Sequence, residues 1–394
     1  MNTRFFLPLA LGGYIVGAAV ASADPIEELL VTGSRDKRVV EVNEALVAAP
    51  DPAHLLLKAP GANVNNNGPI TGILQYRGMY GSRVAVTING NQIASAGPNA
   101  MDAPISYAAG QLESLQIYRG IAPVSVAQES IGGAVEATLA RAEYGQGDDF
   151  EISGRVRANA QSTNSGYHLG GVLYGSNNQH RFKLGAMTEA GNDASSPDSD
   201  IVPTEYDRSR VDLGYGFNLG PHDLQVDYVR NDTGDAGTPA LPMDIRWIES
   251  DLLSLQYQYE LDHDTRMEVR VYGSDLDHGM TNYHLRPEPM KPDMFRRNQA
   301  RSRNYGFKLT GVLLDDQGQW LVGADGFSEE HDSDIDNPNN PMFFVVNFNR
   351  AQRRILGLFA ERQQELGNDL SAEFGLRLTR VDMDAGEVNA TPAM

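Results

Sequence analysis

The stretch "LLSLQYQYEL", residues 252–261, alternates apolar and polar side chains. One face of such a segment carries the apolar residues Leu253, Leu255, Tyr257, Tyr259 and Leu261. Successive side chains of a β-strand point to opposite faces, so this period of two predicts a strand with one apolar and one polar face. The stretches "HDLQVDYVR" (222–230) and "SAEFGLRLTR" (371–380) repeat the pattern, so we expect a sheet of many such strands.

Eleven candidate strands follow one another, and the lengths of their connections alternate. We expect the strands at about 150–162, 167–176, 180–190, 205–219, 222–232, 249–262, 264–284, 299–314, 317–332, 350–366 and 368–384. Tight turns alternate with longer polar loops at about 191–204, 233–248, 285–298 and 333–349. A soluble sandwich would show the same period of two. Short turns on one rim and long loops on the other favour a transmembrane barrel.

The number of candidate strands is odd, whereas single-chain bacterial barrels have even numbers and plugged transporters have about 22 strands. We therefore predict that residues 147–394 form about the first half of a larger antiparallel transmembrane β-barrel. A smaller barrel with a different strand count is the alternative.

The first 23 residues are typical of a secretory signal peptide. Arg4 precedes an apolar run, and Ala21-Ser22-Ala23 is a small-x-small cleavage signal. A membrane anchor is the alternative, but Pro8 and three glycines interrupt the run. We expect the mature chain to begin near Asp24. Because no other segment offers the roughly 20 apolar residues of a spanning helix, a membrane-embedded form must be a barrel.

Composition excludes several classes of function. The 394 residues carry a formal net charge of −20 and no cysteine. Nucleic acid is therefore not an expected partner, because phosphate binding depends on clustered Lys and Arg. Without cysteine there is no disulfide and no thiolate metal site. The sequence contains no zinc-protease, serine-hydrolase or phosphate-loop motif, so we predict neither an enzyme nor a bound cofactor.

Residues 46–146 have a mixed pattern that predicts a small α+β domain. The alternating stretch "RVAVTINGNQI" (83–93) ends its first strand at Asn89-Gly90, a strong signal for a two-residue hairpin turn. Further short strands are expected within "LESLQIYRG" (112–120) and after the Gly132-Gly133 break. About 100 residues are enough to bury a core.

Three motifs between residues 27 and 140 together resemble the TonB-dependent outer-membrane receptors. They are "EELLVTGSR" (27–35), "QYRGMYGSRVAVTINGNQI" (75–93) and "LESLQIYRGIAPVSVAQESIGGAVEA" (112–137). The resemblance implies a plug domain (46–146) inside a 22-strand barrel in the bacterial cell outer membrane. It also implies that residues 24–45 hold the linker and the TonB box, Glu28, Leu29, Leu30, Val31 and Thr32. Such an extended segment can add as a strand to the sheet of periplasmic TonB. An ordinary edge strand is the alternative.

Two arginines stand at positions where this family places plug residues that pair with barrel carboxylates. They are Arg77 and Arg119, each followed by glycine. The resemblance implies that they lock the plug in the lumen, a role that suits planar guanidinium groups. Simple surface charge is the alternative. The segment "IAPVSVAQES" (121–130) departs from the family pattern, and we expect it at the plug surface.

The stretch "GPNAMDAPISYAAG" (97–110) resembles an outward-facing loop of TonB-dependent copper receptors, with Gly97 in place of the cysteine and Ala103 in place of a proline. The resemblance implies that substrate contacts come from Met79, Tyr80, Asn99, Met101 and Asp102, with Met101 as a metal ligand. Thioethers favour Cu(I). Further soft ligands could come from His278, Met280, His284, Met290 and Met294, although methionine more often packs than ligates. An acidic loop at 329–340 is expected to be solvated, and a divalent-cation site with oxygen ligands is the alternative.

These observations predict a receptor that takes up a scarce solute, either a metal ion such as copper or a metal chelate such as a siderophore. Its expected partners are TonB, outer-membrane lipid and the transported metal or chelate. A surface adhesin or passive pore is an alternative from a different class. A truncated, non-functional receptor is a third.

Overall fold

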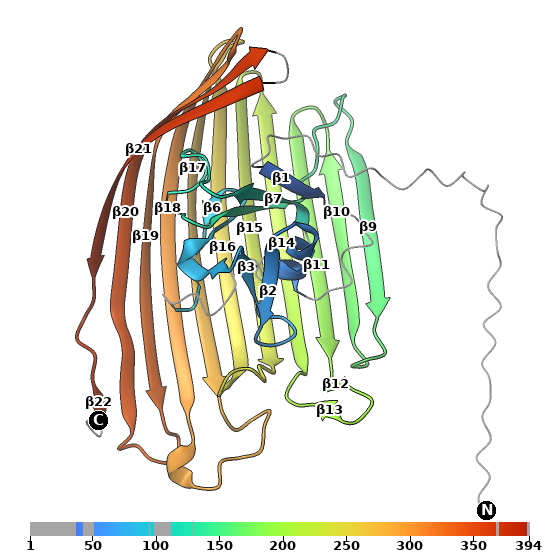
Figure 1. The fold of residues 1–394 in the computed structure, drawn as a ribbon. Helices are drawn as coiled ribbons and strands as arrows, with labels where there is room; N and C mark the ends of the chain where they lie inside the picture. The colour runs from blue at the N-terminus through green and yellow to red at the C-terminus, as the bar shows by residue number, and fades with distance from the viewer. Residues whose placement is uncertain are drawn as a thin grey trace, which may run out of the picture. The chain divides into compact units, whose positions relative to one another are not determined.

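The computed structural model describes residues 37–41, 51–93, 95–97, 112–128, 130–367 and 370–391. Eleven long strands lie side by side in one antiparallel sheet, in the order of the sequence (Figure 1). The first six are β9 (Glu151–Ala160), β10 (Tyr167–Ser176), β11 (His180–Gly191), β14 (Tyr206–Leu219), β15 (His222–Ala236) and β16 (Asp244–Glu260). The other five are β17 (Thr265–Thr281), β18 (Arg297–Asp315), β19 (Gly318–Asp336), β20 (Phe344–Gly367) and β21 (Leu370–Asp384). The short β22 (Ala390–Thr391) pairs with β20 and is the twelfth member. All eleven expected strands are confirmed.

The connections alternate in length as expected. Residues 177–179, 220–221, 261–264 and 316–317 form tight turns at one end of the sheet. At the other end, the long loops comprise residues 161–166, 192–205, 237–243, 282–296 and 337–343. One of these loops holds the hairpin β12 (Ala194–Ser195) and β13 (Asp200–Ile201), and another holds the 3₁₀ helix η5 (Pro292–Met294). We refer to these two ends as the short-turn end and the long-loop end.

Several strands extend further toward the long-loop end than the sequence indicated. The acidic segment 329–340 was expected to be a loop, which is wrong for most of its length, because β19 continues to Asp336. Cross-strand contacts explain the extension. Arg297 Nε of β18 donates to Asp336 Oδ1 at 3.0 Å, and Asn298 Nδ2 donates to Ser333 Oγ at 2.9 Å. These partners pair the ends of the two strands and satisfy their polar groups.

The two faces of the large sheet differ in polarity. One face exposes apolar side chains, among them Leu253, Leu255 and Phe307. The opposite face buries polar and charged residues, including Gln225, Asp227, Arg210, Asp212 and Glu361. An apolar outside with a polar inside is typical of strands that face lipid and a lumen. Within the described residues, β9 and β21 do not pair with each other, so the sheet is open, as in a partial barrel.

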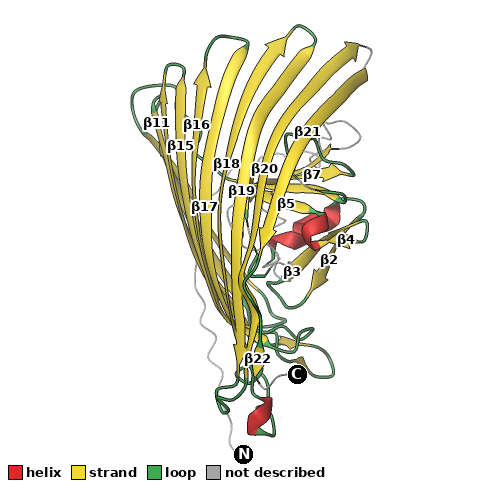
Figure 2. Ribbon diagram, turned by 90° about the vertical axis from the view of Figure 1, so that its left-hand side faces the viewer, coloured by secondary structure: helices red, strands yellow, loops and turns green. Residues whose placement is uncertain are grey.

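Two smaller sheets lie on one side of the large sheet (Figure 2). The five-stranded one has the order β1 (Lys37–Glu41), β7 (Leu112–Arg119), β8 (Gly133–Leu139), β5 (Ala85–Ile88) and β6 (Asn91–Gln92). The other comprises β2 (Ala62–Asn66), β3 (Gly72–Tyr76) and β4 (Met79–Tyr80). The helical segments of this part of the described chain are the 3₁₀ helices η2 (Pro52–Lys58) and η3 (Gly81–Arg83). The hairpin at Asn89-Gly90 is confirmed, since both residues have positive φ, 51° and 71°.

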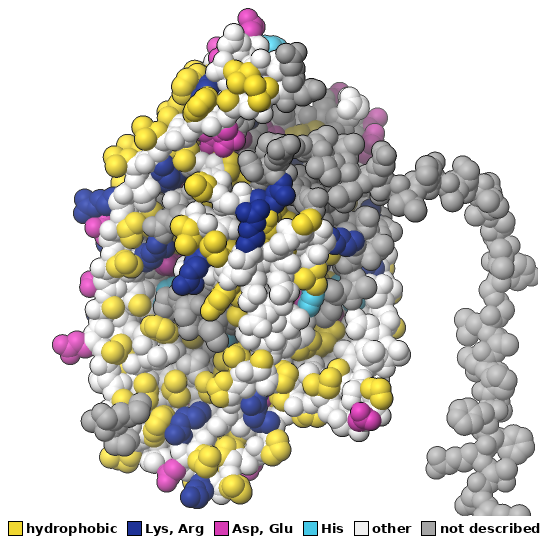
Figure 3. Space-filling model, viewed as in Figure 1, with side chains coloured by type: hydrophobic (Ala, Val, Ile, Leu, Met, Phe, Trp, Pro, Cys, Tyr) yellow, Lys and Arg dark blue, Asp and Glu magenta, His cyan; other side chains and the backbone are white. Residues whose placement is uncertain are grey.

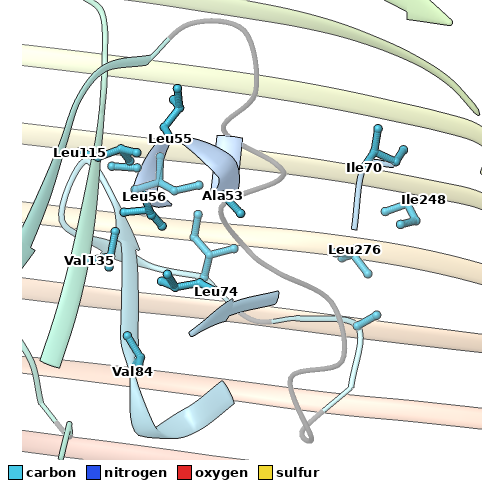
Figure 4. Packing of buried hydrophobic residues seen from close by; sticks show 14 of the residues in the cluster. Ala53, Leu55, Leu56, Ile70, Leu74, Val84, Leu115, Val135, Ile248 and Leu276 are labelled. Atoms are coloured by element: carbon cyan, nitrogen blue, oxygen red, sulfur yellow. The ribbon is translucent and has the colours of Figure 1, made fainter. Parts of the chain in front are cut away.

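Residues 33–394 form one compact unit, and its small and large sheets share a hydrophobic core. Leu56, Leu115 and Val135 of the small domain belong to the same buried cluster as Ile248 and Leu276 of the large sheet (Figure 4). Apolar burial thus contributes to holding the small domain on the strands. In the described part of the chain, no helix is both long and apolar enough to cross a membrane.

Candidate functional site

The contact between the small domain and the polar face of the large sheet is the candidate functional site. Residues 121–128, which follow β7, are held by side chains from β18 to β21. The backbone N–H of Ser125 donates to Glu361 Oε2 at 3.0 Å. Gln128 Nε2 donates to Asp325 Oδ1 at 2.8 Å. Lys308 Nζ donates to the Ser125 carbonyl oxygen. The prediction that segment 121–130 lies at the surface of the small domain is consistent with these contacts.

A buried ion pair completes this contact. Arg377 Nη1 of β21 donates to the Val124 carbonyl oxygen at 2.9 Å and to Asp325 Oδ2 at 3.0 Å. The side chains of Arg377 and Asp325 are only 8% and 9% exposed. A buried charge is costly unless it is paired and hydrogen-bonded, so each of these two side chains depends on the other.

A second set of polar contacts holds the segment that leads from β8 to β9. Arg141 pairs with Asp227 of β15, and its Nη1 donates to Gln256 Oε1 of β16 at 3.3 Å. Lys183 Nζ of β11 donates to the Ala140 carbonyl oxygen at 2.9 Å. The small domain is therefore held at two separate places, and at both the charged groups come mainly from the large sheet.

A polar cavity of about 120 Å³ lies between these two places. Glu136 of β8 lines it from the small domain, and Glu268, Arg270 and Lys308 line it from β17 and β18. The Arg270 guanidinium lies over Gly90, where an added Cβ would overlap it. A cavity of this size and polarity can hold water. If the small domain moves, such water can hydrogen-bond to the polar groups that lose their partners.

Comparison with known proteins places this architecture in a family. The family description "TonB dependent receptor-like, beta-barrel" matches residues 188–393, which are 206 of the 394 residues. The chain belongs to the TonB-dependent receptor family. A second description, "TonB-dependent Receptor Plug Domain", matches residues 40–134, so the small domain is the plug. No curated protein matches the chain.

Several solved TonB-dependent receptors share this fold. The copper transporter OprC is 22% identical over 91% of this chain, with a TM-score of 0.77. The hemophore receptor HasR of Serratia marcescens, solved with its hemophore HasA and heme, is 17% identical over 89% of this chain, with a TM-score of 0.73. The ferric yersiniabactin uptake receptor FyuA of Yersinia pestis is 14% identical over 90%, with a TM-score of 0.67. This chain spans 58%, 52% and 60% of those three chains.

The structure describes only some of the residues expected to form the site of this receptor. The TonB box, Glu28, Leu29, Leu30, Val31 and Thr32, lies outside the described residues, as do Asn99, Met101 and Asp102. Met79 packs on Gly132 and against the hydrophobic core, whereas Tyr80 is 47% exposed. Substrate contact by these two residues stays a prediction.

Arg77 and Arg119 lie on the plug at different exposures. Arg77 has a positive φ of 49°, is exposed and stacks on the Tyr76 ring, with 5.4 Å between Cζ and the ring centroid. Arg119 ends β7 and is half-buried. Neither arginine forms a salt bridge with a carboxylate of the described chain. The charged residues that do hold the plug, Lys308 and Arg377, lie on barrel strands and carry no motif by which sequence reasoning would find them.

The further metal-ligand candidates do not all lie together. His278 and Met280 are two residues apart on β17, on the face of the sheet that packs against the plug. Met290 and Met294, in the long loop 282–296, are 95% and 51% exposed. Among the described residues, no three His, Asp or Glu side chains are grouped so that they could hold a metal ion.

Proposed function

We propose that this chain is the plug and part of the barrel of a receptor in the bacterial outer membrane that imports a scarce metal or metal chelate, driven by TonB. The main support for this proposal is that polar contacts hold the plug on the lumenal face of the strands. Hydrogen bonds and ion pairs around residues 121–128 and Arg141 supplement the shared hydrophobic core. Polar contacts can be exchanged for water without large cost, which suits a plug that must move to open a path.

The position of the TonB box supports a mechanical role. Thr32, the last residue of the box, is five positions before Lys37, where β1 begins. β1 is an edge strand that pairs only with β7 within the five-stranded sheet, from Lys37↔Tyr118 to Glu41↔Ser114. A pull on the box would act first on this edge strand, whose few hydrogen bonds can open one after another.

Deletion of Glu28 to Thr32 tests the energised part of the proposal. We expect uptake of the metal or chelate to be abolished, while binding to the receptor is unchanged, because the box contacts TonB rather than the solute. Loss of both activities would contradict the assignment of the box. Uptake that persists without TonB or a proton-motive force would instead favour the passive pore.

Copper is the metal we propose, with Met101, His278 and Met280 as ligands. Gly97, four residues before Met101, follows a segment held on the lumenal face, where Asn304 Nδ2 of β18 donates to the Gln92 carbonyl oxygen at 2.7 Å. Imidazole and thioether groups suit copper. The name of OprC, a copper transporter, adds support for the substrate class.

The ligands are tested by copper retention in the folded receptor. Met101→Ala and Met280→Ala should each weaken copper binding by about tenfold or more, since each removes one of few ligands. Met342→Ala is the matched control, because this methionine is 68% exposed in loop 337–343 and is not a ligand candidate. Retention that is equal in all three variants would remove the support for copper and leave a metal chelate as the substrate class.

We also propose that Arg77 and Arg119 hold the plug through carboxylates outside the described residues. Figure 3 shows several separate Lys and Arg side chains on the face where the viewer looks onto the plug. Arg77→Glu should then loosen the plug, as measured by faster amide exchange in β3 and β4 of the complete receptor. Unchanged exchange would favour simple surface charge.

A further inference from the structure

Four of the long loops are connected to one another at the long-loop end. Loops 192–205 and 237–243 share a hydrogen bond from Gly237 N to the Glu205 carbonyl oxygen at 2.8 Å. Loops 282–296 and 337–343 share two, from Asn337 Nδ2 to the Pro292 carbonyl oxygen at 2.9 Å and from Asn340 Nδ2 to Asp293 Oδ1 at 3.0 Å. We call these four loops the outer-loop collar.

Arg286 joins the two halves of the outer-loop collar. Its Nε and Nη2 donate to the two carboxylate oxygens of Asp244, each at 2.6 Å. Its Nη1 also donates to the Leu241 carbonyl oxygen at 3.1 Å. Asp244 is fully buried and accepts a further hydrogen bond from Thr238 N at 2.9 Å. A bidentate guanidinium of loop 282–296 therefore fixes both ends of loop 237–243.

Loop 237–243 in turn contacts the plug, backbone to backbone. Ala240 N donates to the Asn67 carbonyl oxygen at 3.5 Å. Gly68 faces Gly237 so closely that a Cβ at Gly68 would overlap the Gly237 carbonyl oxygen. Asn67 and Thr238 are 5% and 1% exposed, so this contact is buried. Loop 237–243 therefore helps to hold the plug turn 67–71, whose Ile70 also packs in the shared hydrophobic core.

We infer that Arg286 is a positioning residue that couples the outer-loop collar to the plug. Within the described chain its guanidinium donates to Asp244, Leu241 and Thr238 and not to the plug, but it holds the loop on which the plug turn packs. A solute that displaces loop 282–296 would release Asp244, then loop 237–243, and then the plug turn. The role of this coupling in uptake rests on the proposed function, whereas the coupling itself is a property of the folded chain.

Amide hydrogen exchange of the folded protein, without TonB or solute, tests the coupling. Arg286→Gln removes the bidentate contact, so exchange should become about tenfold faster both in loop 237–243 and in plug residues 67–71. Arg286→Lys keeps the charge but cannot form the bidentate hydrogen bonds to Asp244, so it should give an intermediate exchange rate. Strands β15 to β17 should exchange as before, which shows that the variants are folded.

Arg296→Gln is the matched control in the same loop. The Arg296 guanidinium donates to the carbonyl oxygens of Asp293 and Phe295 and stacks on the Phe343 ring, and its backbone N–H donates to Asn282 Oδ1. Its loss should speed exchange in loop 337–343 and leave residues 67–71 unchanged. If Arg286→Gln loosened only the loops and not the plug turn, the coupling would be refuted.

Gly68→Ala opens the same contact from the plug side, because its Cβ meets the Gly237 carbonyl oxygen. If both variants break one contact, the Gly68→Ala/Arg286→Gln double variant should exchange at residues 67–71 no faster than the faster single variant. If the rate increase in the double variant were instead the product of the two single increases, the two residues would act separately. TonB-independent uptake would overturn the proposed function without changing these exchange rates.

Discussion

Gly90 shows at the scale of one residue how the plug hairpin and the barrel fit together. Gly90 and Gly78 both have a positive φ, 71° and 77°. Alanine at either position should cost about 1–2 kcal/mol in the free energy of unfolding, because the left-handed backbone region disfavours a Cβ. Only at Gly90 would the Cβ also overlap Arg270 of β17, whereas nothing lies within 4 Å at Gly78.

We therefore expect Gly90→Ala, but not Gly78→Ala, to speed amide exchange along the plug–barrel contact in addition to lowering stability. Urea unfolding measures the loss of stability, and mass-resolved amide exchange measures the exchange rate along the plug–barrel contact. If the two variants were indistinguishable in both measurements, Arg270 would not contribute to seating the hairpin.

His284 should make the outer-loop collar sensitive to pH. Its Nε2 donates to the Ile245 carbonyl oxygen at 3.2 Å, and its Nδ1 accepts from the Thr281 hydroxyl. Burial lowers the pKa of His284; the nearby Asp235 and Asp244 oppose this effect, and Arg246 adds to it.

The released loop therefore binds a proton at a higher pH than the docked loop does. Docking should weaken as pH falls below the ordinary imidazole pKa of about 6.5, because the released state then gains the proton. Exchange of loop 282–296 between pH 8 and 5, corrected for intrinsic rates, measures this effect. His284→Gln should remove the dependence, whereas His263→Gln, in an exposed tight turn, should leave it intact.

At this scale the sequence identified residues whose role is local. Asn89-Gly90 was predicted as a hairpin turn because the turn chemistry depends on two adjacent residues. Arg377 and Asp325 could not be assigned in this way, because Arg377 contacts Val124, which is 253 positions away in the chain. Such a contact depends on where whole strands lie and not on any local pattern.

At the scale of the element, the period of two predicted the eleven long strands of the large sheet, but neither the short β22 nor where each strand ends. β16 begins at Asp244 and β20 at Phe344, each at least five residues earlier than expected. Those extensions, DIRWI (244–248) and FVVNFN (344–349), are mainly apolar but do not keep a strict period of two, so their pattern alone does not predict a strand. They are strands because they pair with neighbouring strands: Ile245 lies opposite Met280 of β17, and Val345 lies opposite Ile335 of β19.

The apolar outer face makes a depth-dependent prediction for single strands. Leu255 lies within the exposed apolar stretch of β16, whereas Tyr259 lies near its short-turn end. In a bilayer, Leu255→Arg should cost about 2–4 kcal/mol and Tyr259→Arg about 0–1 kcal/mol, because water is closer at the rim. Reversible urea titration in lipid vesicles compares them. Equal costs would mean that these positions do not lie at different depths.

At the scale of the whole molecule, the plug depends on buried ion pairs with the barrel. Asp325→Ala leaves Arg377 buried without its carboxylate, which should cost about 3–5 kcal/mol and release segment 121–128. The double variant with Arg377→Met should cost less than the sum of the two single variants. Limited proteolysis of the plug and urea unfolding report these effects.

Arg380→Gln is the control on the same strand, since Arg380 pairs with Asp382 and their side chains are 78% and 58% exposed. Exposed pairs contribute little, so its effect should stay below about 1 kcal/mol. A loss equal to that of Asp325→Ala would show that the location of the pair does not matter.

The eleven strands in sequence order have a directional consequence. Neighbours alternate in direction, so β9 and β21 run the same way. A second copy placed by a two-fold rotation about the barrel axis would bring like-directed edges together and force parallel pairing at both seams. Any segment that joins β21 to β9 with antiparallel pairs on both sides must contribute an odd number of strands. This sheet can therefore close with antiparallel pairs throughout only when the total number of strands is even.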